Sequence, residues 1–357
     1  MKHTTIKRFT HLRCRSLCII LLASATLLTI DSLGQAQDRV VPKRDAVASG
    51  KFVEITPTTV KITVRNKEQS FDMGDVRKLS FDGEPNTLDR VREGVLQGQY
   101  EQALDEVKKI STDGIKNPLI KQDIEFYRYY CEGKLGLTGQ ADKLSAIKGL
   151  LSVDKENPKS HHLYELSDML GQLALAVNQP DQATRFFNRL LSAGSPDTKA
   201  LGAYRMGTVE LAQGKVDEAK ARFGQLAEAT SASPEMGRLK SLAEVGLATC
   251  EQMAGNNEQA LQKLDSLAQQ YDSTDQGLFA RINNARGACY AALGKTTQAL
   301  LSYLQTDLLF FTDAEAHAEA LYHLSKLWPQ AGQPARGAEA KARLTAQYAS
   351  SLWANKE

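Results

Sequence analysis

The sequence predicts a mainly α-helical protein in which about seven helix pairs stack into a superhelical solenoid, after a small β module. Three observations predict this architecture. Apolar and polar residues alternate, with the period of strands, only between residues 50 and 83. From residue 84 to 350, Ala, Leu, Gln, Glu and Lys dominate at helical spacing. Within that region a short turn motif recurs roughly every forty residues.

Residues 1–36 are expected to be a signal peptide. Basic residues precede an apolar run from Leu17 to Ile30, and the small residues Gly34 and Ala36 follow it, as signal peptidase requires. The run is too short to cross a bilayer comfortably, although an uncleaved anchor or a chance apolar run is the alternative. We therefore expect export to the periplasm or the cell exterior, with no stable membrane span.

The charge of the chain changes if these residues are removed. Residues 1–36 hold five Lys or Arg and one Asp, a net charge of +4, whereas the whole chain is +2. The remainder is therefore −2. Binding to nucleic acid needs a positive surface that replaces the counterions of the phosphates, so no nucleic-acid partner is expected.

A small β module is expected at residues 50–83, after a linker at 37–49. Val60, Ile62 and Val64 alternate with polar neighbours, and turn-forming residues break the pattern into about four short strands. Such a meander is too small to be stable by itself. We expect it to close into a barrel-like unit or to pack against the first helices.

The helical region, 84–350, contains seven copies of a turn motif. A Gly or Asn is followed five residues later by a residue that is usually Ala, and these second positions are 41, 39, 36, 41, 39 and 38 residues apart. The copies run from Gly98 to Ala103, Gly139 to Leu144, Asn178 to Ala183, Gly214 to Ala219, Gly255 to Ala260, Gly294 to Ala299 and Gly332 to Gly337.

This motif resembles the turn between the two helices of the tetratricopeptide repeat (TPR). A small residue is expected seven positions before the turn, and it is present as Gly171, Gly207, Ala248 and Gly287. A large apolar residue is expected four positions after the usual Ala that ends the turn motif and begins the second helix, and it is present as Val107, Phe187, Phe223, Leu264 and Tyr303. Helices approach closely where side chains are small, and a bulky side chain fills the facing groove.

The repeats also depart from the family pattern. The family period is 34 residues, so longer linkers and a less regular superhelix are expected here. The second copy fits poorly, with Glu132 where a small residue is expected. At the level of architecture the chain resembles exported TPR proteins of the bacterial envelope.

The resemblance implies protein binding on the concave face, which the first helix of each pair forms. The expected function is a non-catalytic scaffold of the cell envelope or exterior that binds other exported or envelope proteins. The alternative is a glycan-binding or polymer-binding protein, or a regulatory subunit of an envelope enzyme complex. The register of the family places the candidate contact residues at Asp168, Gln172, Tyr204, Thr208, Arg281, Asn284, Tyr322 and Lys326.

No catalytic, cofactor or metal site is expected. The sequence has no Gly-x-Ser-x-Gly elbow and no Cys with a plausible His partner. His161 and His162 would point to different faces of a helix, and His317 and His323 are six residues apart, so we expect solvated or capping roles for all four. Cys131, Cys250 and Cys289 are expected to be unpaired small core residues.

The segment Ala299–Trp328 is unusually apolar. Two interpretations remain open. Its residues either are buried against the last helix pair or form a docking or self-association surface near the C-terminus.

Overall fold

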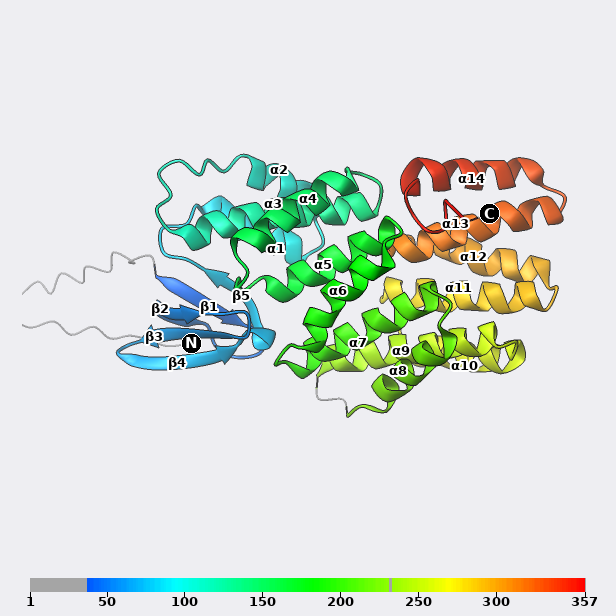
Figure 1. Cartoon of the computed structure of the whole chain (residues 1–357), viewed down its shortest axis with the longest axis horizontal. Coiled ribbons are helices and arrows are strands. Elements are labelled where there is room, and N and C mark those ends of the chain that lie inside the picture. Colours follow the sequence, from blue (N-terminus) through cyan, green and yellow to red (C-terminus); the bar gives the residue numbers. More distant parts are fainter. Residues whose placement is uncertain (1–36, 231–232, 357) are drawn as a thin grey trace, which may run out of the picture. The chain divides into compact units, whose positions relative to one another are not determined.

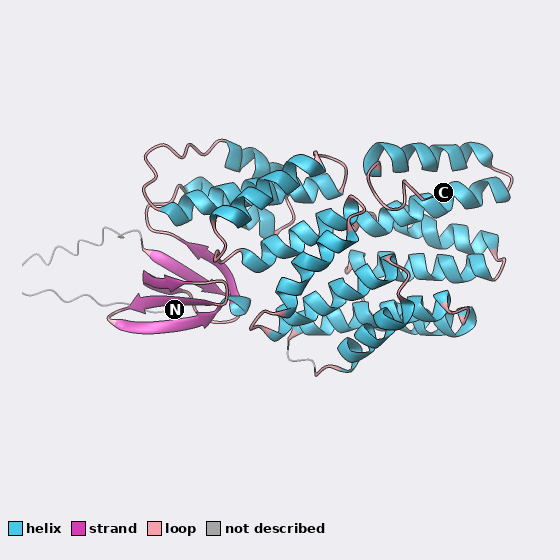
Figure 2. Cartoon of the chain, in the orientation of Figure 1, coloured by secondary structure: helices cyan, strands magenta, loops and turns pink. Residues whose placement is uncertain are grey.

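A computed structural model describes residues 37–230 and 233–356, and the expected signal peptide lies outside these residues. They form fourteen α-helices, a short 3₁₀ helix and a five-stranded sheet (Figure 1). The sheet and the α-helices occupy separate parts of the chain, with the strands first (Figure 2). Within the described ranges, no helix combines the length and apolar character needed to span a bilayer.

The sheet is antiparallel and open. Its strands are β1 (Asp38–Pro42), β2 (Ala48–Ile55), β3 (Thr59–Val64), β4 (Lys67–Asp72) and β5 (Val76–Ser80), in the order β4-β3-β2-β1-β5. The edge strands β4 and β5 do not pair with each other, so the barrel-like closure expected from the sequence is wrong.

The strand β1 also corrects the expected linker at 37–49. It lies between β2 and β5 and buries Val40 completely, and β2 begins inside the same segment with the buried Ala48. Val40 and Val41, beside charged residues, are too few to show the alternation of a strand. Only the pairing with β2 and β5 identifies this segment as a strand. The module packs against the first helices, as predicted, through Val60 and Ile62 in one core with Leu88.

The helices form seven consecutive pairs. They are α1 (Asn86–Leu96) with α2 (Tyr100–Lys108), α3 (Pro118–Leu137) with α4 (Lys143–Glu156), α5 (Leu163–Ala176) with α6 (Pro180–Leu191), α7 (Pro196–Ala212) with α8 (Val216–Glu228), α9 (Pro234–Met253) with α10 (Asn257–Gln270), α11 (Gln276–Ala292) with α12 (Thr296–Leu309), and α13 (Ala314–Gln330) with α14 (Pro334–Tyr348). Each odd-numbered helix contacts the next odd-numbered helix. The first helices of the pairs therefore form one continuous inner layer.

All seven predicted turns have the backbone that the motif implies. Six glycines, with φ from 70° to 89°, and Asn178, with φ of 56°, adopt the left-handed conformation after the first helix of each pair. Glycine reaches this region without a steric penalty, and asparagine is the next best residue. The turn positions are confirmed as Gly98, Gly139, Asn178, Gly214, Gly255, Gly294 and Gly332.

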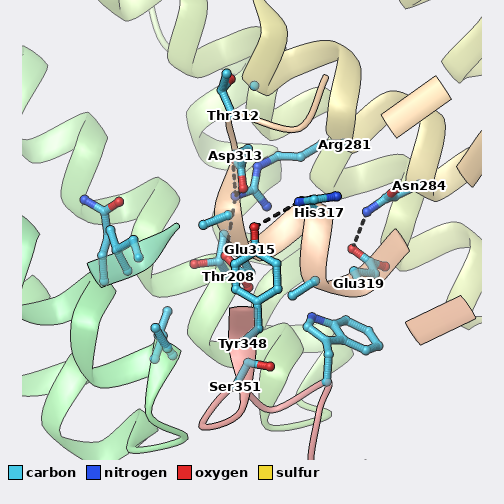
Figure 3. Close-up of a pocket in the computed structure, with 18 of the residues that line it drawn as sticks. Thr208, Arg281, Asn284, Thr312, Asp313, Glu315, His317, Glu319, Tyr348 and Ser351 are labelled. Atoms are coloured by element: carbon cyan, nitrogen blue, oxygen red, sulfur yellow. Dashed lines mark hydrogen bonds and ion pairs between the residues drawn. The ribbon is translucent and has the colours of Figure 1, made fainter. Parts of the chain in front are cut away.

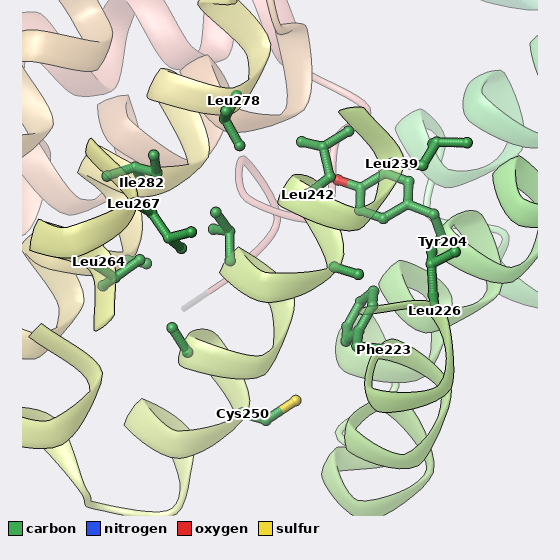
Figure 4. Packing of buried hydrophobic residues seen from close by; sticks show 14 of the residues in the cluster. Tyr204, Phe223, Leu226, Leu239, Leu242, Cys250, Leu264, Leu267, Leu278 and Ile282 are labelled. Atoms are coloured by element: carbon green, nitrogen blue, oxygen red, sulfur yellow. The ribbon is translucent and has the colours of Figure 1, made fainter. Parts of the chain in front are cut away.

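The small and large positions of the motif meet inside each pair. A side chain at Gly207 would come within 2.5 Å of the Phe223 ring, and one at Gly287 within 2.6 Å of the Tyr303 ring. Where the first helix carries Ala248 instead, the partner position carries the smaller Leu264. Close packing therefore conserves the summed volume at the crossing. Phe223 joins a larger core with Tyr204 and the leucines of α9 (Figure 4).

The second pair departs from the expected register. Its helix α4 begins at Lys143, and the cap Asp142 accepts hydrogen bonds from the backbone of Leu144 and Ser145. Leu144, expected at the buried position, is 66% exposed, and Ala146 is buried in its place. Two additional residues precede this helix, and they shift every later position of the pair.

Candidate functional site

A large cavity lies along the inner layer of helices. Its volume is about 1340 Å³, and side chains from α3, α5, α7, α9, α11 and α13 line it together with the C-terminal segment. We call this cavity the inner groove. It exceeds the roughly 300–1,000 Å³ of a small-molecule site, which suits a longer ligand.

Five of the eight predicted contact residues lie in this groove: Gln172, Tyr204, Thr208, Arg281 and Asn284. Figure 3 shows three of them, Thr208, Arg281 and Asn284, around one part of the cavity.

The other three predicted residues lie elsewhere. Asp168 supports the wall by pairing with Arg205, which itself lines the groove. Tyr322 is only 8% exposed and packs against Trp353, and Lys326 lies over the outer face of the Tyr322 ring. The last repeat is therefore closed at the positions where the family register expects contacts.

Ion pairs join the inner helices to one another. Arg205 on α7 lies 2.7 Å from Asp168 on α5. Arg281 on α11 lies 3.0 Å from Asp313, the cap of α13. Both pairs connect neighbouring repeats, so these guanidinium groups fix the shape of the wall and their charges are already compensated.

Two lysines at the α3–α4 end of the groove lack such compensation. The Lys134 ammonium lies 5.8 and 5.4 Å from the ring centres of Tyr100 and Tyr130. Neither Lys134 nor Lys143 forms an ion pair with any residue in the described ranges, and burial lowers the pKa of both. Cation–π contacts only partly replace lost hydration, so an anion would be stabilised here.

The α11–α13 side of the groove carries an uncompensated carboxylate. Glu319 accepts a hydrogen bond of 2.9 Å from the Asn284 amide, as Figure 3 shows. Burial raises the pKa of Glu319 to about 7. The Asn284 amide nitrogen also donates a hydrogen bond of 2.7 Å to the Ala316 carbonyl. The Asn284 amide oxygen is buried and has no hydrogen-bond partner among the described residues.

The C-terminal segment closes one side of the groove. Trp353 packs 5.6 Å from the ring centres of both Tyr322 and His323. The backbone of Gln347 lies directly against Gly139, and Ser350 donates a 3.4 Å hydrogen bond to the Ala176 carbonyl. The seventh pair thus reaches back to the second and third pairs.

The expected solvated or capping roles are wrong for His161, His162 and His317, whose side chains are buried. His162 stands at the N-cap position of α5, but its side chain makes no cap hydrogen bond. The first two precede α5 in a turn rather than a helix, so their adjacent rings converge on one carboxylate, Asp123. His317 is buried between Asp307 and Tyr348, 2.9 Å from each.

His323 is half-buried beside the groove and stacks on Tyr303. No local pattern predicts that His161 and His162 contact Asp123, because Asp123 lies 38 residues before His161.

All three described cysteines are buried and unpaired. Burial raises the pKa of Cys131 to about 12 and that of Cys250 and Cys289 to about 11. Their sequence interpretation as core residues is confirmed.

No protein-family model and no curated protein matches this sequence. Solved structures do match the fold. A Rap protein complexed with Competence and Sporulation Factor is 15% identical, with 75% of this chain and 77% of that chain covered and a TM-score of 0.54. A tetratricopeptide repeat protein from Parabacteroides merdae is 18% identical, with 73% and 91% covered and a TM-score of 0.47. Together with the seven helix pairs, the likeness to the Rap structure shows that residues 86–348 have the fold of a TPR-type solenoid.

Proposed function

We propose that this protein is a non-catalytic scaffold whose inner groove binds an extended segment of another protein. The observation that carries the proposal is the groove itself, about 1340 Å³ in volume and lined by five of the residues that the repeat register selects. Concave inner surfaces are the usual binding surfaces of solenoids.

The chemistry of the groove suits a peptide better than a compact metabolite. Gln172, Thr208 and Asn284 donate hydrogen bonds within the protein, and each keeps a side-chain oxygen that can accept from a peptide N–H group. Leu239 and Leu242 provide apolar wall between them. An extended segment needs both along its length, because its backbone groups lose water on entering the groove.

The uncompensated charges suggest how the segment is oriented. Lys134 and Lys143 favour an acidic side chain or a carboxyl terminus at the α3–α4 end. Glu319 favours a basic side chain or an amino terminus near α13. A ligand that supplies both charges would relieve the desolvation of both ends of the groove.

The similar Rap structure is described as complexed with Competence and Sporulation Factor, which supports the use of this fold for binding. We extend the proposal to location. The basic and apolar pattern of residues 1–36 supports export, so the partners would be exported or envelope proteins.

The glycan-binding alternative has less support. It would use exposed aromatic faces, but Tyr204 and Tyr322 are only 4% and 8% exposed. No observation favours a regulatory role in an enzyme complex over direct binding.

The test is capture of partners from an envelope fraction by immobilised protein. Lys134→Met removes the uncompensated charge and keeps the apolar stem between its two tyrosines. Lys215→Met, at an exposed turn between α7 and α8, makes the same change outside the groove. We expect wild type and Lys215→Met to capture the same proteins and Lys134→Met to lose them. Equal capture by all three folded proteins would refute binding in the groove.

We also propose self-association through α12. Leu301, Leu308 and Leu309 are 58%, 64% and 60% exposed, whereas Leu321 and Leu324 of the same apolar segment are buried. Exposed apolar clusters of this kind mark interfaces. Light scattering should show a lower mass for Leu308→Glu than for wild type. Leu144→Glu, equally exposed on α4, is the control, and an unchanged mass for Leu308→Glu would exclude this interface.

A further inference from the structure

A second polar cluster lies outside the inner groove, where the second helix pair meets the third. Asp123 on α3 faces His161 and His162, which precede α5. The Nε2 atoms of the two imidazoles lie 3.2 and 3.0 Å from the same carboxylate oxygen, Oδ1 of Asp123. The side chains of all three residues are at most 5% exposed.

We propose that Asp123, His161 and His162 bind one divalent transition-metal ion of the Zn²⁺ type. Imidazole and carboxylate are the nitrogen and oxygen ligands that such ions take, at about 2.0–2.2 Å. Two donors at that distance from one ion, at angles near 90–110°, are about 3.0–3.4 Å apart. The observed separations of 3.2 and 3.0 Å agree, and the donor atoms of all three residues lie within 4.8 Å of one another.

The surrounding residues hold the ligands as an outer shell would. His162 Nδ1 lies 3.0 Å from the Glu165 carboxylate, a contact that fixes which ring nitrogen faces Asp123. The second oxygen of Asp123 accepts hydrogen bonds of 2.7 and 3.1 Å from Arg92. The Phe126 ring stacks on the His162 ring, with 3.7 Å between the ring centres. Asp123 and His162 are therefore held in place before any ion binds.

The charges of the cluster leave room for a divalent cation. Glu84, Asp123 and Glu165 each carry a negative charge, and among the described residues Arg92 is the only cation that pairs with any of them besides the histidines. With both imidazoles in their neutral, ligating form, two negative charges are uncompensated. A single divalent ion balances them.

A second cavity, of about 280 Å³, reaches this cluster. His161 lines it together with polar residues that include Gln122 and Ser160. The Gln122 amide nitrogen and His161 Nδ1 are buried and have no hydrogen-bond partner within the described residues. Unsatisfied buried groups of this kind usually bind ordered water. The cavity therefore offers a route for the ion and space for water at an open coordination position.

The experiment uses the full chain purified without a histidine tag and stripped with a chelator. Isothermal titration with Zn²⁺ should show about one equivalent bound and a higher melting temperature, and Mg²⁺ should show neither, because Mg²⁺ prefers an all-oxygen shell. If the folded protein binds less than roughly a fifth of an equivalent of Zn²⁺, the cluster is an ion-pair network only and the proposal is overturned.

The variants locate the site. His161→Gln keeps the Arg92–Asp123 pair and should weaken Zn²⁺ affinity by about 100-fold or more, with loss of the melting shift. His317→Gln is the matched control, since His317 is equally buried beside a carboxylate but has no second histidine. Unchanged affinity of His161→Gln would refute the assignment. So would thiolate-to-metal charge-transfer bands with Co²⁺, which would place the ion at a cysteine.

Discussion

Gly207 illustrates how single residues set the spacing of the helices. Its Cα faces the Phe223 ring across the crossing of α7 and α8, and Phe223 also packs against Gly246 on α9. One aromatic ring thus fills the space between three helices, which approach closely because two of them carry glycine. Gly171 and Gly287 repeat the arrangement against Phe187 and Tyr303.

We expect Gly207→Ala to destabilise the protein by about 1–3 kcal/mol, because the added methyl group would overlap the Phe223 ring, which also lies against Gly246. Phe223→Leu should partly rescue that variant, since Ala248 with Leu264 is the natural combination at the crossing of α9 and α10. Urea denaturation of both single variants and the double variant measures the coupling. Strictly additive changes would show that the two positions do not share the space.

Glu319 predicts a pH dependence of stability. Burial raises its pKa from the ordinary 4.5 to about 7, so the folded state holds a proton that the unfolded state releases. This contribution is fully favourable below pH 4.5, declines as the pH rises and is lost above about 7.

Glu319→Gln removes this proton and should be more stable than wild type at pH 8 by about 1–3 kcal/mol, with little difference at pH 4.5. Denaturation curves of the two proteins between these pH values provide the measurement. Because all other titrating groups are common to both, a constant difference across the range would contradict the raised pKa.

At the scale of elements, α4 shows how a cap sets the register of a helix. The six other second helices begin two residues after the turn residue, whereas α4 begins four residues after Gly139. Asp142 caps α4 through hydrogen bonds of 3.2 and 3.1 Å from two backbone amides. The later start brings Gly149 against the Tyr129 ring, so in this pair the small residue lies on the second helix.

Replacing this cap should cost stability. Asp142→Ala leaves two amide groups at the N-terminus of α4 without their acceptor, and we expect a loss of about 0.5–2 kcal/mol. Asp142→Asn, which retains an accepting oxygen, should lose less. Thermal or urea denaturation distinguishes the two variants, and equal losses would show that charge rather than capping matters.

At the scale of the whole described unit, the C-terminal segment connects repeats that are far apart in sequence. Each pair of a solenoid normally depends on its immediate neighbours. Here Gln347 and Ser350 also contact the turn at Gly139 and the end of α5. The inner groove is therefore bounded at this point by contacts that a linear stack would lack.

We expect truncation after Ala349 to affect two separate regions. Amide exchange should become faster in α13, which loses the packing of Trp353, and at the end of α5, which loses the hydrogen bond from Ser350 to the Ala176 carbonyl. Exchange in the core of α9 should stay the same, because its neighbours are unchanged. Hydrogen exchange measured by mass spectrometry gives the comparison, and unaltered protection at the end of α5 would show that the Ser350 contact contributes nothing.

The sequence alone determined the helix pairs, their turns and the small-to-large contacts such as Gly207 with Phe223. These features follow from backbone geometry and from a period that recurs along the chain, so they are visible without coordinates. The same register also selected five residues that line the inner groove.

Only the tertiary structure decided the rest. The pairing of β1 between β2 and β5, the lack of an ion partner for Lys134 among the described residues, and the meeting of Asp123 with His161 and His162 were decided in this way. Each depends on how distant segments are brought together. No local pattern encodes such meetings, because the energy that produces them comes from burying many side chains at once. The periodic elements were therefore predictable, whereas the charges left within the groove and the proposed metal site were not.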